Sequence, residues 1–325
     1  MKHILFIFLI AVSQIISAQN LKNNPSALHG NKFEQLGSIL SDPNEFRSAS
    51  GAPGGKYWQQ KADYNIDCNL DEKNLTLNGT EWVTYHNNSP DKLDYIWMQL
   101  DENQHDPNSD ANYFDENKID QPVTDATLKG LMLKERLDGL GDKILEVSDE
   151  LGKPIKYTIN QTMMRIDLPK TLMPGGKIKY KIKWKYKLSN RMETGGRGGY
   201  EYFPEDGNHI FIMSQWFPRL CVYSDFQGWQ NKQFTGRGEF ALAFGNYKVK
   251  MTVPADHVVC STGEIQNVTQ ILNPTQLQRW QKAQTSTEVI EVVNLEEAKA
   301  AEKSANKTAT TIVAINITFS APRFV

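Results

Sequence analysis

The chain is 325 residues long, which is enough for two average domains or one large β-domain with attachments. Its 36 Lys and Arg residues nearly balance 38 Asp and Glu residues, so the basic excess that nucleic-acid binding requires is absent. Aromatic residues make up 10% of the chain, too many for a disordered protein, and the longest apolar run is too short to span a bilayer as a mature helix. We therefore expect a folded protein whose partners include neither nucleic acid nor a membrane.

The N-terminus has the anatomy of a secretory signal peptide. Met1–His3 is a short basic region, Ile4–Val12 is an unbroken apolar stretch, and Ser13–Ala18 ends in small residues. The sequence therefore predicts that residues 1–18 are removed and that the protein is secreted or periplasmic. Residues 19–56 are rich in Asn, Ser, Gly and Pro and are predicted to form a flexible leader.

The cysteines do not form a disulfide framework. Cys68, Cys221 and Cys260 are odd in number and widely spaced, so at most one bridge can form even in an oxidising compartment. No C-x-x-C pair is present for zinc or redox chemistry. We expect small, buried apolar cysteines and leave their disulfide state open.

From Tyr57 onward, the sequence is dominated by alternating apolar and polar residues, the pattern of strands with one buried face. The runs Tyr64–Leu70, Leu75–Tyr85 and Leu93–Leu100 are joined by short turns and predict an antiparallel meander. The polar segment Asp101–Gln121 follows as an inserted loop.

Strand patterns then continue almost to the C-terminus. They occur at Lys143–Val147, Ile155–Ile159, Met163–Leu168, Ile178–Leu188, His209–Met213, Glu239–Phe244, Tyr247–Val253, Val258–Ile265 and Thr311–Phe319. A helix begins where Asn273 supplies an N-cap and Pro274 the first position. The prediction is a mainly β fold, an antiparallel β-sandwich or saddle-like layered sheet with a short C-terminal helix. We expect a β-domain at 57–268, then a helix and a final strand at 269–325.

Two conspicuous patterns are interpreted as structural. Every second residue of Lys177–Lys187 is Lys, which indicates a solvated face or a guarded sheet edge more than a ligand patch. Gly195–Gly199 is interpreted as a loop, because Tyr200–Pro204 supplies neither the Lys-Ser/Thr nor the strand-to-helix context of a phosphate-binding loop.

Catalytic motifs are missing. No two of the six His are spaced i, i+4, and there is no H-E-x-x-H, so a zinc site built from His86, His105 and His209 has no support from spacing. There is no G-x-S-x-G elbow around Ser214, and a Cys nucleophile would need a His partner that the sequence does not place.

Aromatic residues and acids gather between positions 200 and 239. The aromatic residues are Tyr200, Tyr202, Phe203, Trp216, Phe217, Tyr223, Phe226 and Trp229, and the acids are Glu201, Asp206, Asp225 and Glu239. Such a group is consistent with a glycosidase or a sugar-binding module, and equally with core aromatics and loop acids. Both interpretations stay open at this point.

The same region resembles a known family. The stretches are HIFIMSQWFPRLCVYSDFQGWQNKQF at 209–234, YWQQKADYNID at 57–67, YHNNSPDKLDYIW at 85–97 and GEFALAFGNYKVKMTVPAD at 238–256. In order and spacing they resemble the N-terminal β-domain of the aminopeptidase N family of zinc metallopeptidases (gluzincins), above all its secreted bacterial members. The resemblance covers roughly residues 57 to 265, with the helix near 273–284 as further support.

The resemblance implies a saddle-like β-domain that precedes a thermolysin-like catalytic domain. In the family, that second domain binds zinc through H-E-x-x-H and a distal Glu, and binds the substrate amine through G-x-M-E-N. Neither motif occurs in this chain. We therefore expect no catalytic residue, no metal ligand and no cofactor in this chain, zinc in the full-length family, and either a truncated gene product or an independent module.

The resemblance also points to one candidate substrate-binding residue, Gln215. Family members extend an acidic or amide side chain from the β-domain towards the substrate N-terminus, just after a Gln that Gln215 matches, but the contact position here is Phe217. The expected partners are the missing catalytic domain or a peptide substrate, with self-association through an exposed domain interface. The alternatives are a free-standing secreted module that binds peptide or glycan through residues 200–229, and a glycosidase-like hydrolase using Glu201 or Glu239.

Overall fold

A computed structural model describes residues 43–112, 125, 128, 139–236, 238, 240–303 and 310–318. The predicted signal peptide, most of the leader and part of the Asp101–Gln121 loop lie outside these residues. The chain forms two compact units. Within the described residues the smaller unit comprises 43–58 and Ser224–Gly228, and the larger comprises Gln59–Tyr223 and the residues from Trp229 onward.

The smaller unit is organised around Arg47. Its guanidinium donates to both carboxylate oxygens of Asp225 at 2.8 to 3.0 Å and lies over the rings of Tyr57 and Phe226, 5.0 and 5.1 Å from their centroids. Arg47 also forms a β-bridge with Pro53. The described part of the leader therefore has local structure, while the flexibility of the leader as a whole stays a prediction.

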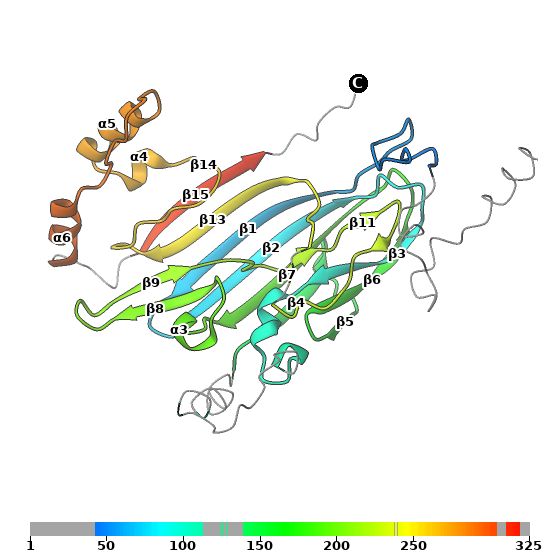
Figure 1. Cartoon of the computed structure of the whole chain (residues 1–325), viewed down its shortest axis with the longest axis horizontal. Coiled ribbons are helices and arrows are strands. Elements are labelled where there is room, and N and C mark those ends of the chain that lie inside the picture. The colour runs from blue at the N-terminus through cyan, green and yellow to red at the C-terminus, as the bar shows by residue number, and fades with distance from the viewer. Residues whose placement is uncertain are drawn as a thin grey trace, which may run out of the picture. The chain divides into compact units, whose positions relative to one another are not determined.

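The main sheet of the larger unit has seven strands in the order β14-β15-β13-β1-β2-β7-β4. They are β1 (Lys61–Asp71), β2 (Thr76–His86), β4 (Lys143–Asp149), β7 (Lys177–Lys187), β13 (Asn246–Pro254), β14 (Glu264–Ile265) and β15 (Thr310–Thr318). Figure 1 shows β13, β1 and β2 as long neighbouring arrows. β1 and β13 pair in parallel and the other pairs are antiparallel, so the sheet is mixed.

A second sheet has four strands in the order β10-β3-β6-β5. They are β3 (Leu93–Gln99), β5 (Tyr157–Asn160), β6 (Met163–Leu172) and β10 (Arg219–Leu220). Two strand pairs complete the β structure: β8 (Gly199–Phe203) with β9 (Asn208–Ile212), and β11 (Tyr223–Ser224) with β12 (Gly228–Trp229).

The helices whose bounds lie within the described residues are short. They are the 3-10 turns η2 (Asp101–His105) and η3 (Asp110–Asn112), and α3 (Arg191–Thr194), α4 (Val268–Ile271), α5 (Pro274–Ala283) and α6 (Leu295–Lys303). The predicted start of α5 is confirmed: the Asn273 side chain accepts from the Gln276 backbone N–H at 2.9 Å, and the Gln276 side chain accepts from the Asn273 N–H at 3.2 Å. This capping box satisfies donors that a helix start would otherwise leave unpaired.

The two sheets share one core because the period of two in each strand turns its apolar residues to the same side. In β7, Tyr180, Ile182 and Trp184 are buried between Lys residues that point outwards. The Tyr180 hydroxyl donates to the Met98 sulfur of β3 at 3.1 Å, which joins the layers. Gly79 of β2 lies under the Trp184 indole, where a β-carbon would overlap the ring.

The predicted fold class is confirmed as mainly β with layered sheets and a short C-terminal helix, the main sheet being mixed. Two predicted strands are wrong in part. Glu239–Phe244 forms only isolated bridges at Leu242 and Phe244, and Val258–Ile265 is a strand only at its last two residues. Leu242 is 43% exposed and Val258 72%, so these apolar side chains do not have the burial expected of strand residues that face the core.

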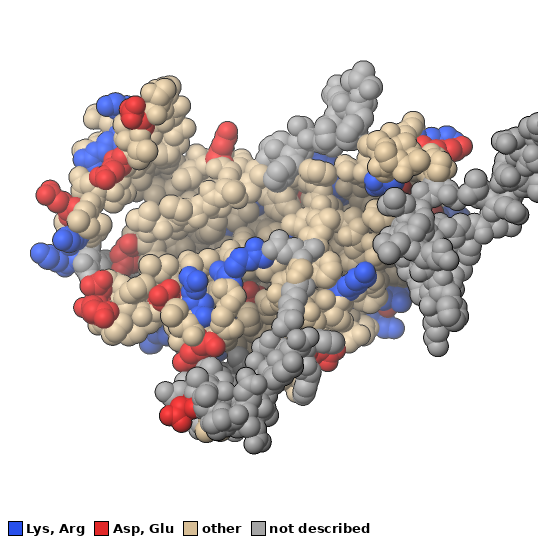
Figure 2. Space-filling view, in the orientation of Figure 1, with Lys and Arg blue, Asp and Glu red and all other residues tan. Residues whose placement is uncertain are grey.

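The alternating Lys residues of β7 lie on a solvated face, which is one of the two structural interpretations predicted from the sequence. The guarded-edge interpretation is wrong, because β7 lies between β2 and β4. Glu146 of β4 pairs with Lys181 at 2.7 Å and Lys183 at 2.8 Å, and the Lys179 ammonium lies 4.9 Å from the Trp82 ring centroid. Figure 2 shows both signs of charge interspersed on the face that it displays.

Candidate functional site

Gln215 lies in the loop between β9 and β10 and has a left-handed backbone, with a φ of 55°. This conformation is uncommon for residues other than Gly, and such strain gathers at functional sites. Its neighbours are fixed by the core: Trp216 packs 6.0 Å from Trp184 and Phe217 packs edge-on at 5.5 Å from Tyr64, between ring centroids. Within the part of the chain that the structure describes, the Gln215 side chain makes no hydrogen bond.

The aromatic cluster between 200 and 229 is mostly structural. Five of its members are half-buried and pack against the core of the larger unit: Tyr200, Trp216, Phe217, Tyr223 and Trp229. Tyr202 and Phe226 are 49% and 46% exposed. The packing favours core aromatics over a glycan platform at this place.

The acids near that cluster do not form a carboxylate pair. Glu201 lies 3.8 Å from the Arg191 guanidinium, and Asp225 is bound by Arg47 in the smaller unit. Asp206 is exposed in the turn after β8, and Glu239 lies outside the described residues. The described geometry therefore gives no support to a glycosidase site.

Sequence reasoning missed a group of acids in the fold, the buried Glu81, Asp101 and Glu102 and the half-buried Asp142. Burial raises the pKa of Asp142 to about 8 and raises the pKa values of Glu81 and Glu102 well above the ordinary range, and Asp142 adds to both. Burial also raises the pKa of Asp101, although its ion pair with Arg219 opposes the change. Burial therefore favours the protonated form of Glu81, Glu102 and Asp142, whereas Asp101 is paired with Arg219.

The three histidines considered for zinc occupy separate environments. His86 faces Asp63 at 3.1 Å, and His209 faces Glu72 at 3.2 Å. Burial lowers the pKa of His105 to about 4. Among the described residues, no three His, Cys, Asp or Glu side chains are placed to hold a metal ion.

All three cysteines are free in the structure. Cys68 and Cys221 are buried and Cys260 is exposed. Burial raises the pKa of Cys68 to about 12 and also raises the pKa of Cys221, so these thiols stay protonated. The predicted burial holds for two of the three.

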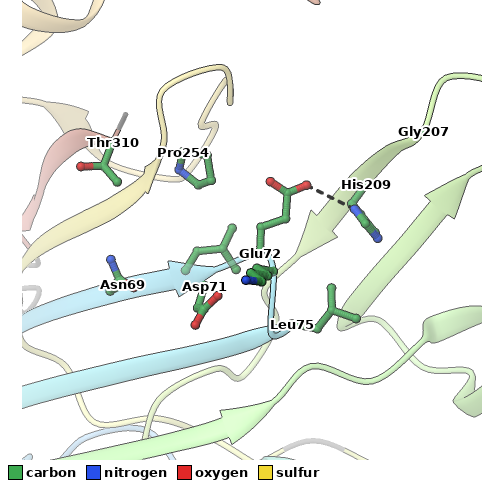
Figure 3. A pocket seen from close by; sticks show the side chains of 10 residues that line it. Asn69, Asp71, Glu72, Leu75, Gly207, His209, Pro254 and Thr310 are labelled. Atoms are coloured by element: carbon green, nitrogen blue, oxygen red, sulfur yellow. Dashed lines mark hydrogen bonds and ion pairs between the residues drawn. The ribbon is translucent and has the colours of Figure 1, made fainter. Parts of the chain in front are cut away.

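A hollow of about 600 Å³ lies at one end of the seven-stranded sheet (Figure 3). We call it the Glu72 pocket. The Glu72 carboxylate lies between His209, whose Nδ1 is 3.2 Å away, and His257, whose Nε2 is 3.9 Å away. The Nδ1 of His257 is 3.0 Å from Asp256. Sequence reasoning missed this cluster because its members come from three distant segments.

A smaller hollow, about 460 Å³, lies over β3, β5 and β6. We call it the Trp97 pocket. It is lined by Trp97, Lys156, Thr158, Asn160, Arg165 and Asp167. No motif pointed to it, because its residues lie on three separate strands.

In the described part of the chain, no helix combines the length and apolarity that a bilayer crossing requires.

No family model and no curated protein matches this chain. Solved structures that are similar include the M1 zinc metallopeptidase of Deinococcus radiodurans (TM-score 0.35, 11% identity, 81% of this chain and 40% of that one). A mutant of that enzyme bound to a Tyr-Ser-Ala substrate has a TM-score of 0.36 at 11% identity, covering 79% and 39%. A two-domain M1 zinc metallopeptidase mutant bound to L-tryptophan gives 0.36 at 11% identity, covering 82% and 41%. The chain thus spans about two fifths of the length of these proteins, and at these TM-scores the likeness carries no weight for function.

Proposed function

We propose that this chain is the non-catalytic N-terminal β-domain of a secreted zinc aminopeptidase of the aminopeptidase N type. The observation that carries the proposal is the sequence resemblance in four ordered stretches between residues 57 and 265. Those stretches supply the greater part of β1, β3 and β9 and all of β13 in the larger unit. Their agreement with a layered β architecture supports the proposal, since a local motif in an unrelated fold would not be spread over both sheets.

The proposal assigns zinc and peptide hydrolysis to a partner domain. H-E-x-x-H and G-x-M-E-N are absent from this sequence, and zinc-activated water needs three protein ligands around the metal. The catalytic domain is accordingly the proposed partner. Exposed apolar side chains at Leu242 (43%) and Phe244 (39%) offer surface for it, or for self-association when it is missing.

Gln215 is the proposed contact to the substrate amine. Its left-handed backbone and its side-chain amide, which has no hydrogen bond to the described residues, support this role, because both are expected of a side chain held ready for a ligand. The core packing of Trp216 and Phe217, the two residues that follow it, fixes this side of the loop, so the amide is positioned before any substrate arrives.

The proposal is tested with the purified chain alone, by zinc content and by release of amino acids from aminoacyl p-nitroanilides. We expect no stoichiometric zinc and no chelator-sensitive release. One zinc per chain together with activity would refute the assignment of catalysis to another domain.

A second measurement tests Gln215. A tripeptide with a free N-terminus is titrated by NMR against the same peptide acetylated, with the chain and with Gln215→Ala. The free amine should bind more tightly, and the variant should lose that preference. Gln227→Ala, in the smaller unit, is the matched control. Equal binding of both peptides to the unaltered chain would exclude the proposed contact.

A further inference from the structure

The Trp97 pocket is built from a grid of side chains on the outer face of the four-stranded sheet. Trp97 of β3 pairs with Arg165 of β6, which pairs with Thr158 of β5, so the three residues form one row. The neighbouring row holds Tyr95 opposite Asp167. Alternation turns all of these away from the core, where Ile96, Met98 and Ile166 lie.

Arg165 is fixed in place before any ligand arrives. Its Nε donates to Asp167 at 2.8 Å, and its guanidinium carbon lies 4.1 Å from the centroid of the Tyr95 ring. Its two terminal nitrogens have no partner among the residues that the structure describes. A guanidinium held by stacking and by one hydrogen bond presents its remaining edge for bidentate binding of a carboxylate.

The charge around the pocket favours an anion. The Lys156 ammonium also lies near Asp167, at 3.9 Å. The single Asp167 carboxylate therefore neutralises only one of the two positive charges of Lys156 and Arg165. The Lys156 and Arg165 side chains are 81% and 44% exposed, so both are accessible to a ligand.

The remaining polar groups suit a hydroxyl-rich ligand. The Thr158 hydroxyl and the Asn160 side-chain amide make no hydrogen bond within the described ranges, and both residues line the same pocket as the half-buried Trp97. In the Glu72 pocket, by contrast, Glu72 and His209 satisfy each other. Unpaired donors and acceptors beside a flat aromatic surface are what a ligand pocket of mixed polarity requires.

We propose that the Trp97 pocket binds a carboxylate-bearing sugar residue of an acidic polysaccharide. The sugar ring packs over the Trp97 indole, its carboxylate is held by Arg165, and its hydroxyls bond to Thr158 and Asn160. A peptide added as a strand would pair with the backbone at the edge of β5, whereas this pocket lies on the sheet face and offers side chains, which favours the sugar. The inference is independent of the proposed aminopeptidase relationship.

The test is isothermal titration calorimetry of the full chain with trigalacturonate and, as its neutral counterpart, a galactose trisaccharide. We expect the acidic sugar to bind at least tenfold more tightly than the neutral one, and less tightly as salt is added. Arg165→Gln should reduce that preference to within twofold. Trp97→Ala should abolish binding of both sugars.

The matched control is Trp82→Ala, on the outer face of the other sheet, where Lys179 covers the ring. This variant should bind as the unaltered chain does. If Trp97→Ala fails to fold by circular dichroism, Arg165→Gln and Thr158→Val decide, since neither residue is in the core. Absence of trigalacturonate binding overturns the proposal. So does an unchanged preference in Arg165→Gln, or binding only of a peptide with a free C-terminal carboxylate.

Discussion

Replacing Glu81 by Gln should make the protein more stable at neutral pH. The Glu81 side chain is fully buried on the inner face of β2, between Ile66 of β1 and Ile182 of β7. Neither carboxylate oxygen has a hydrogen-bond partner among the described residues. Burial therefore raises its pKa well above the ordinary value of 4.5, and the nearby Asp142 carboxyl adds to the effect.

The sign and size follow from proton linkage. A raised folded-state pKa means that the folded chain binds a proton that the unfolded chain releases above about pH 4.5. Stability is therefore lost as pH rises from there towards the folded pKa, at about 1.4 kcal/mol for each pH unit. Between pH 5 and pH 7 this amounts to about 3 kcal/mol. Gln has nearly the same shape as Glu and keeps a buried polar group. The substitution therefore removes only the pH-dependent part of the free-energy cost of burying this side chain.

The assay is urea unfolding of both proteins at pH 5, 6 and 7, where Asp142, with a pKa of about 8, keeps its proton. The stability difference between Glu81→Gln and the unaltered chain should grow by about 3 kcal/mol across this range. Glu264→Gln, at an exposed position on β14, is the matched control and should show a much smaller change. A difference that stays flat from pH 5 to pH 7 would mean that Glu81 is ionised in the fold, and the reasoning would be wrong.

Two further substitutions test the core. Gly79→Ala should cost roughly 2 to 3 kcal/mol in urea unfolding, because the new methyl group overlaps the buried Trp184 indole; an unaffected midpoint would show that the indole can move aside. Arg219→Met should lower stability by about 3 to 5 kcal/mol by leaving the fully buried Asp101 carboxylate without its ion pair. The double variant with Asp101→Leu should regain most of the loss, and a double variant as unstable as the single one would show that the pair is not the cause.

The alternation of apolar and polar residues was sufficient to predict most strands, but not which strands pair with each other in a sheet. The face of each residue in β7 follows from a period of two, which is why the outward position of its Lys residues was predicted. Whether β7 is an edge depends on β4 pairing with it, and no local pattern encodes that choice. The parallel pairing of Tyr64 with Tyr247 likewise joins segments far apart in sequence. Such pairings are decided by the whole chain, so they were not predictable from windows of a few residues.

The buried acid in β2 was, in contrast, visible in the sequence. Glu81 is in phase with Leu77, Val83 and Tyr85, all of which are buried, while Trp82 is out of phase and faces outwards. By residue type alone, Trp82 would be assigned to the core and Glu81 to the surface. The period of two assigns them the other way round, with Glu81 inside. Conflict between residue type and phase is a signal of a special position, because natural sequences are otherwise consistent across these levels.

The same phase argument explains why one outer aromatic residue is a site and another is not. Trp82 and Trp97 both point away from the core, each on a strand inside its sheet. Next to Trp82, β7 places Lys179 over the ring, so its surface is already occupied. Next to Trp97, β6 places Arg165, whose guanidinium lies over the Tyr95 ring instead of the indole. The identity of the adjacent strand, and of the side chain that it places beside the indole, therefore decides which tryptophan is free to bind a ligand.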